Sequence, residues 1–187
     1  AAASLTFGVL GVGWDDLVAG LQGVQDTTAQ AAVVKRMPRT VMALIIGAAL
    51  GVSGAVMQGV TRNPLADPEI FGVNAGASLA VVTGMVFFGL ASTTGYIWVA
   101  MAGASVAAVF VYAVGSLGRG GASPLKLALA GAATSVALGS VVSAILLPRA
   151  QEMQSFRFWQ IGGVGGATWD KIALVLPFLG AGMLIAL

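Results

Sequence analysis

The chain has 187 residues, of which 58% are hydrophobic and only 9% charged. Nine basic and seven acidic side chains cannot cover the surface of a water-soluble domain of this size, so the composition excludes a soluble globular protein and indicates an integral membrane protein. The absence of cysteine and histidine excludes a disulfide framework, a thiolate or imidazole metal site and a Ser-His-Asp or Cys-His catalytic group, and the net charge of +2 comes without the basic patch that nucleic-acid binding requires.

The first 35 residues precede the first predicted membrane span. Residues 1–13 are apolar but too few to cross a bilayer, and they lack the basic segment of a signal peptide. The run Trp14-Asp15-Asp16-Leu17 predicts the start of a short amphipathic helix, with acidic residues in the first turn, where the helix dipole favours them. Residues 25–32 read as a polar linker. We expect residues 1–35 to form an external segment that follows an earlier helix.

Uncharged runs predict a transmembrane bundle over residues 36–187. Residues 40–61 are 22 residues without a charge, and a helix of that length spans about 33 Å, enough for a hydrocarbon core of about 30 Å. The uncharged run at residues 70–118 is too long for one helix, and the polar cluster at residues 92–95 divides it. We expect five spans, at about 40–61, 71–91, 96–117, 125–147 and 171–187. The last is short and lacks a polar flank, so we expect the chain to stop inside or just after its fifth helix.

Small residues recur every four positions in two of these spans. The two stripes are Gly47, Gly51, Ala55 and Gly59, and Gly131, Ser135, Gly139 and Ser143. Small side chains let helices approach closely in lipid, where packing drives association. We therefore interpret both stripes as helix-packing surfaces, which by themselves say nothing about transport.

The basic residues do not settle the orientation of the bundle. If the spans alternate, six cations share one side and three the other; the larger group is Lys35, Arg36, Arg39, Arg149, Arg157 and Lys171, and the smaller is Arg62, Arg119 and Lys126. The positive-inside rule would place the larger group in the cytoplasm, yet the first helix often dominates orientation. Charge counting alone therefore leaves the orientation open.

Two arginines lie just ahead of the first long span. Pro38 separates Arg36 from Arg39, and we expect this proline in the first turn of the helix. The arginines either anchor the helix end at the interface by snorkelling or present a pair of guanidiniums to an acidic partner, whose carboxylates fit the planar fork of arginine.

Two prolines four residues apart follow the same span. Pro64 and Pro68 cannot continue a helix, because each lacks an N–H donor and restricts the residue before it. The segment is either an ordinary cytoplasmic turn or a broken-helix element at the mouth of a pathway, because irregular backbone at membrane depth needs protein or water around it. Met57 and Gln58 lie in the lower half of the span, and the amide of Gln58 either lines a pathway or bonds a neighbouring helix.

The glycine-rich run at residues 162–166 could suggest a phosphate-binding loop. It lacks the Gly-Lys-Ser/Thr ending of a P-loop and a preceding strand, so we expect a compact external turn before the last span. No other motif in the sequence indicates ATP hydrolysis, and we expect neither enzymatic activity nor a resident metal or cofactor.

Over about forty residues the chain resembles the membrane-spanning permease subunit of ABC importers for iron-siderophores, haem and vitamin B12. The resemblance rests on RMPR at residues 36–39, on GAALGVSGAVMQGVTRNPLADPEIFGVNAGA at residues 47–77, and more weakly on residues 129–131 and 158–166. It implies an all-α integral membrane protein of the cell membrane, with about five of the ten helices of a type II importer permease.

The resemblance also implies roles for single residues and partners. Arg36 and Arg39 would face outward and meet glutamates of a substrate-binding protein, which places the arginine-rich side outside. Asn63 and Leu65 would belong to a cytoplasmic gate, with a second element from residues 121–125 that includes Ser123, although this loop is rich in glycine and proline rather than in hydroxyls. ATP hydrolysis would lie on separate ATPase subunits, and the permease's coupling helices, which contact those subunits, would lie in a region beyond Leu187.

A second permease subunit, identical or related, would lie beside this chain in the membrane lipid, with the pathway at their interface. The expected cargo is an iron-siderophore, with haem or cobalamin as alternatives. Two other classes stay open: half of a secondary transporter, which the charge-free spans disfavour, and a membrane-anchored assembly protein without a transport role.

Overall fold

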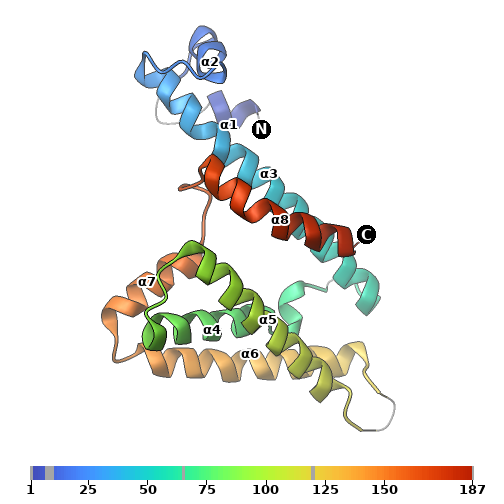
Figure 1. Ribbon diagram of the computed structural model, residues 1–187. Coiled ribbons are helices and arrows are strands. Elements are labelled where there is room, and N and C mark those ends of the chain that lie inside the picture. Colours follow the sequence, from blue (N-terminus) through green and yellow to red (C-terminus); the bar gives the residue numbers. More distant parts are fainter. Residues whose placement is uncertain (1, 7–10, 65, 119–120, 187) are drawn as a thin grey trace. The chain divides into compact units, whose positions relative to one another are not determined.

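The computed structural model describes residues 2–6, 11–64, 66–118 and 121–186, and every element among them is a helix (Figure 1). In chain order these are α1 (Ala2–Thr6), α2 (Trp14–Leu21), α3 (Thr28–Thr61), the 3-10 helix η1 (Pro68–Phe71), α4 (Val73–Phe88), α5 (Thr93–Gly115), α6 (Pro124–Leu146), α7 (Ala150–Ile161) and α8 (Trp169–Ala186). The chain divides into two compact units, Ala1–Val56 with Gly163–Leu187, and Met57–Gly162.

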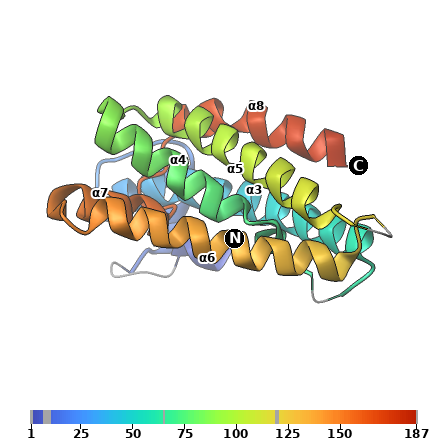
Figure 2. The ribbon, with the colours of Figure 1, turned by 90° about the horizontal axis from the view of Figure 1, so that it is seen from below.

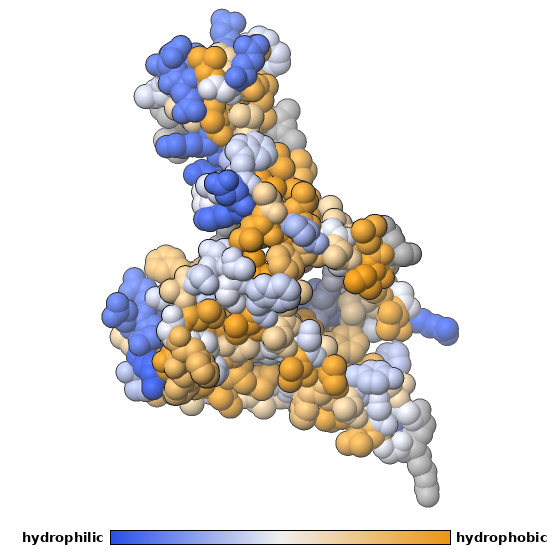
Figure 3. Space-filling view, viewed as in Figure 1, coloured by the Kyte–Doolittle hydropathy of each residue, from blue (hydrophilic) through white to orange (hydrophobic). Residues whose placement is uncertain are grey.

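Four helices, α3, α5, α6 and α8, are long and apolar enough to cross a membrane. Their large apolar side chains are exposed: Val106 on α5 is 69% and Val136 on α6 is 72% accessible. On the face drawn in Figure 3, apolar residues cover much of the α4–α7 unit, and hydrophilic ones gather where α7 begins. Helices that are apolar on all sides and exposed are stable in lipid rather than water, so the chain has a helix-bundle integral membrane fold.

The start of α3 differs from the prediction. We expected Pro38 in the first turn, but α3 begins at Thr28 and Pro38 lies in its interior. The hydroxyl of Thr27 accepts a hydrogen bond from the Gln30 amide N–H at 3.2 Å, and the Gln30 side-chain oxygen accepts one from the Thr27 N–H at 3.2 Å. This reciprocal pair is a capping box, which satisfies the free N–H groups at a helix start. The stretch interpreted as a polar linker is therefore a helix cap.

The break after α3 follows the prediction from the two prolines. The helix ends at Thr61, and η1 begins at Pro68 with the Asp67 carboxylate accepting a hydrogen bond from the Glu69 N–H at 2.7 Å. Gly72, with φ of 67°, lies between η1 and α4. A second left-handed glycine, Gly89, ends α4 after 16 residues, so this helix is shorter than the span expected at 71–91.

Helices α4, α5 and α6 pack on one another, and α7 lies against α4 and α6 (Figures 1 and 2). Helices α4 and α5 approach closely at Gly76 and Gly103, because a Cβ atom on Gly76 would lie 2.5 Å from the Gly103 carbonyl oxygen and would overlap Ala107. By contrast, a Cβ atom on Gly47, Gly51, Gly59 or Gly139 would meet no described atom within 4 Å. The tight helix contact therefore lies away from most of the two predicted stripes.

The breaks at residues 92–95 and 162–167 lie where the sequence predicts them, but the region of α7 differs from the prediction. Ser92 caps α5 by accepting a hydrogen bond from the Gly95 N–H at 3.1 Å, so the polar cluster at residues 92–95 does separate two helices. Residues 162–167 turn between α7 and α8, as predicted, with the Ala167 N–H donating to the Val164 carbonyl at 3.0 Å. Helix α7 itself was not predicted; it is held by Phe156, which is only 4% exposed in a core cluster with Val82 and Val142.

Candidate functional site

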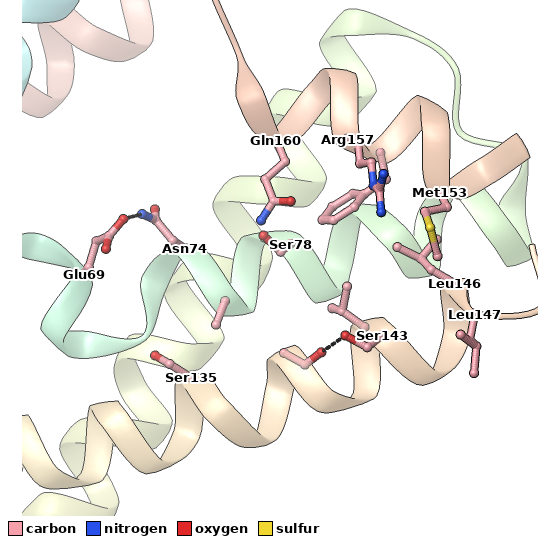
Figure 4. Close-up of a pocket in the computed structure, with 14 residues that line it drawn as sticks. Glu69, Asn74, Ser78, Ser135, Ser143, Leu146, Leu147, Met153, Arg157 and Gln160 are labelled. Carbon is pink, nitrogen blue, oxygen red and sulfur yellow. Dashed lines mark hydrogen bonds between the residues drawn. The ribbon is translucent and has the colours of Figure 1, made fainter. Parts of the chain in front are cut away.

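An open cavity of about 580 Å³ lies between α4, α6 and α7, with η1 at one end (Figure 4). Its polar lining comes from each of these elements: Glu69 from η1, Asn74 and Ser78 from α4, Ser135 and Ser143 from α6, and Arg157 and Gln160 from α7. Within one compact unit, the fold thus gathers polar side chains between two apolar helices, α4 and α6, and the more polar helix α7.

Helical spacing explains why these residues share one cavity. Ser135, Gly139 and Ser143 recur every four residues, so they lie on one face of α6. Asn74 and Ser78 have the same spacing on α4. The stripe on α6 that was predicted to pack against another helix therefore lines a cavity along most of its length, and glycine at position 139 leaves room there.

Two hydrogen bonds are made inside the lining. The Asn74 amide donates to the Glu69 carboxylate at 2.6 Å, and the Ser143 hydroxyl donates to the Gly139 carbonyl at 2.9 Å (Figure 4). The first bond ties η1 to α4, and the second leaves the oxygen of Ser143 able to accept. Glu69 and Arg157 lie at opposite ends of the cavity in Figure 4.

The other polar groups of the lining have no partner among the described residues. They are the hydroxyls of Ser78 and Ser135, the amide of Gln160 and the guanidinium of Arg157. These groups are accessible to solvent rather than buried, and a cavity lined by several of them is suited to water or to a polar solute. It is not suited to a lipid tail.

The residues predicted from the sequence as gate and pathway lie elsewhere. Met57 and Gln58 belong to the last turns of α3, and the Gln58 carbonyl accepts a hydrogen bond from the Asn63 N–H at 3.2 Å. Ser123 caps α6, with its hydroxyl oxygen accepting from the Lys126 N–H at 3.3 Å. None of these four predicted residues lines the α4–α6–α7 cavity. Leu65 lies outside the described residues.

The two predicted docking arginines do come together. In the other unit, Arg36 and Arg39 line one cavity of about 520 Å³. The other residues that line it are Ser4, Thr40, Ala43, Leu44, Val164 and Gly165. Arg36 is half-buried and donates to the Leu5 carbonyl at 3.0 Å, whereas Arg39 is exposed and makes no hydrogen bond or ion pair with a described residue. The pair is therefore asymmetric: one guanidinium holds α1, and the other is available.

Sequence reasoning missed most of the cavity lining. A glycine-serine stripe on α6 was read as a packing surface, and Arg157 was counted only as a surface cation. The alternation of glycine with serine was at best a weak signal, because serine is found with glycine and alanine on the packing faces of membrane helices. Asn74 and Ser78 gave a weaker signal of the same kind.

The sequence of the chain is similar to those of known transport proteins. The sequence model of the FecCD transport family matches residues 1–187. A Bacillus subtilis protein named as a probable siderophore transport system permease, YfiZ, is 37% identical over 98% of this chain and 55% of its own length. The ferric enterobactin transport system permease FepD of Escherichia coli is 45% identical over 79% of this chain and 44% of its own.

Two further likenesses bear on cargo and on fold. The cobalamin import system permease BtuC of Halobacterium salinarum is 34% identical over 88% of this chain and 44% of its own. A solved ABC transporter structure in an inward-facing conformation, described as of the metal-chelate type, superposes with a TM-score of 0.72 at 27% identity, covering 95% of this chain and 54% of that one. The chain thus spans about half the length of these relatives.

Proposed function

Because the chain belongs to the FecCD transport family, we propose that it forms part of the permease of an ABC importer, in the plasma membrane, for an iron-siderophore or related ferric chelate. The family consists of transport permeases rather than catalytic subunits. In this proposal separate ATPase subunits hydrolyse ATP, a substrate-binding protein delivers the chelate, and a second permease subunit, identical or related, completes the pathway.

The observation that carries the proposal is the polar cavity between α4, α6 and α7. Ferric chelates are rich in oxygen atoms, which accept hydrogen bonds from hydroxyls, amides and guanidinium groups. The unpartnered hydroxyls of Ser78 and Ser135 and the donors of Gln160 and Arg157 are of this kind. Because the helices around them expose apolar side chains, a passage for a polar solute would need such a lining.

The arginine pair supports delivery by a soluble partner. We propose that Arg39, with help from Arg36, meets acidic residues of the substrate-binding protein outside the membrane. Both arginines line one open cavity, and Arg39 has no partner among described residues. A planar guanidinium that is free to pair with a carboxylate suits such a contact.

The proposed inner gate rests on the helix break after α3. We assign Asn63 and Leu65 to it, with Met57 and Gln58 next to it on the last turns of α3. The backbone is irregular from Thr61 to η1, which is the kind of segment that can change conformation at a pathway mouth. Ser123 is the weakest member of the set, because its hydroxyl already caps α6.

A cobalamin cargo is the second candidate, because one relative is a cobalamin import permease. A secondary transporter remains the alternative from another class. It would need ionisable groups for ion coupling within its spans. The window of each candidate span in this chain carries at most two charged residues, and the uncharged runs at residues 40–61 and 127–148 carry none.

An uptake assay distinguishes these functions. A strain that lacks its own permease would carry the complete importer with this protein, and uptake of a ⁵⁵Fe-siderophore and of labelled cobalamin would be compared. We expect chelate uptake that vanadate blocks and that a proton ionophore leaves largely intact while cellular ATP is maintained. Uptake that the ionophore abolishes and vanadate spares would refute the importer and support the secondary transporter.

A further inference from the structure

We infer that Arg157 makes the α4–α6–α7 cavity selective for anionic, oxygen-rich solutes, and so favours ferric chelates with net negative charge. The inference deepens the proposed function and rests on it for the identity of the cargo. It rests on the structure alone for the charge of the cavity.

The two charged residues of the lining are not equivalent. Glu69 lies at the η1 end and its carboxylate accepts a short hydrogen bond, 2.6 Å, from the Asn74 amide. Arg157 lies at the α7 end, and its guanidinium has no hydrogen bond or ion pair among the described residues (Figure 4). The lining therefore carries one charge of each sign at separate places, negative at the η1 end and positive at the α7 end.

The groups around Arg157 favour the same kind of solute. Gln160, one turn along α7, offers an amide N–H₂, and Ser78 on α4 and Ser143 on α6 bring hydroxyls to the same cavity. Guanidinium hydrogen bonds to an anionic oxygen are about twice as strong as those between neutral groups. An anionic chelate gains charge-assisted hydrogen bonds from Arg157 as well as the neutral hydrogen bonds, whereas a neutral chelate gains only the neutral ones.

Another arginine close by in the sequence serves as a matched control. The guanidinium of Arg149 donates to the Ile145 carbonyl at 2.7 Å and lies 5.7 Å from the centre of the Phe87 ring. It carries the same charge as Arg157 and precedes α7 by one residue, but it does not line the cavity. Removing its charge changes the net charge of the chain equally.

The absence of cysteine in the chain allows a direct measurement of the cavity potential. The protein is reconstituted in lipid vesicles. The substitution Ser143→Cys then places a single thiol in the lining, across from Arg157 in Figure 4. Its reaction rates with an anionic sulfonate and a cationic ammonium methanethiosulfonate reagent of similar size give a rate ratio. We expect Arg157→Gln to lower the anion-to-cation ratio several-fold, because the positive charge speeds the reaction of the anionic reagent and slows that of the cationic one.

Three further variants and two ferric complexes complete the test. Arg157→Lys should retain most of the anion-to-cation rate ratio of the Ser143→Cys protein. Arg149→Gln should leave this ratio unchanged within experimental error, and Glu69→Gln should raise it. In the Ser143→Cys protein, the trianionic ferric tricatecholate should slow labelling more than the neutral ferric trihydroxamate, and Arg157→Gln should remove this difference.

The inference is overturned if Arg157→Gln and Arg149→Gln change the rate ratio equally, or if the two ferric complexes protect the thiol to the same extent. These measurements do not use ATP or transport. A failure of the importer proposal in the uptake assay is therefore distinguishable from a failure of the charge-selective cavity.

Discussion

The backbone carbonyl of Ile70 in η1 lies directly against Gly131 of α6, so closely that a Cβ atom at position 131 would overlap it. The segment between α3 and α4 therefore rests on α6 backbone to backbone. This contact fixes the end of the cavity where Glu69 lies. It also gives the first member of the α6 stripe a different function from the others, which line open space.

We expect Gly131→Ala to displace η1 and to destabilise the protein by about 1–3 kcal/mol, the usual cost of overpacking a close contact. The matched control is Gly139→Ala on the same helix, where a Cβ atom would meet nothing within 4 Å. Thermal unfolding in detergent measures both variants. Equal midpoints for the two would show that η1 does not rest on Gly131.

The capping box at the start of α3 predicts a difference between two adjacent threonines. Thr27→Ala removes the hydroxyl that accepts from the Gln30 N–H and should cost about 1 kcal/mol. Thr28→Ala removes a hydroxyl that has no partner among the described residues, and it should be close to neutral. Hydrogen exchange at residues 28–31 reports the fraying directly. Faster exchange in Thr28→Ala than in Thr27→Ala would contradict the assignment.

Substitutions of Arg36 and of Arg39 should have different effects. Arg39→Glu should weaken binding of the substrate-binding protein at least tenfold without changing stability, because its guanidinium is exposed and has no described partner. Arg36→Ala should instead loosen α1, whose Leu5 carbonyl it holds at 3.0 Å. Titration of the binding protein against the reconstituted permease, with protease sensitivity of the first residues, measures both. Unchanged affinity in Arg39→Glu would remove the docking assignment.

Much of the fold could be predicted from the sequence, because long uncharged runs indicate membrane helices and polar clusters indicate the breaks between them. The break at residues 92–95 was readable because Ser92 is a helix cap, and the break after Thr61 because two prolines follow it. The early start of α3 was missed because a short polar run was read as a linker, although Thr27 and Gln30 have the spacing of a capping box. Helix α7 was missed because it is too polar for a span, and its single buried anchor, Phe156, leaves no periodic pattern.

The cavity was less predictable than the helices. Its lining combines three helices and η1, so no single segment of sequence contains it. The α6 stripe could be seen, but whether a small-residue face meets another helix or an open space depends on how the helices cross. Of the glycines in this stripe, only Gly131 makes a tight contact with a described residue, in η1, and another tight contact joins Gly76 and Gly103, where two small residues on different helices meet.

Orientation gives a further prediction. Lys35 and Arg62 are both exposed and lie on either side of the uncharged run of α3. In the cysteine-free chain, Lys35→Cys should react with a membrane-impermeant maleimide added to intact cells, and Arg62→Cys should react only after permeabilisation. Reaction of both residues in intact cells would place the arginine pair and the bend on one side of the membrane.

Blocking the cavity tests the central claim, that the cavity between α4, α6 and α7 lines part of the pathway of the chelate. Gly139→Leu extends a side chain into the cavity from a position where a Cβ atom meets no described atom within 4 Å, and Ala137→Leu adds a leucine to an exposed position on the same helix outside the lining. In the complete importer, we predict that Gly139→Leu lowers ⁵⁵Fe-siderophore uptake at least tenfold at unchanged expression and thermal stability, while Ala137→Leu retains it. Undiminished uptake through the Gly139→Leu permease would contradict the account.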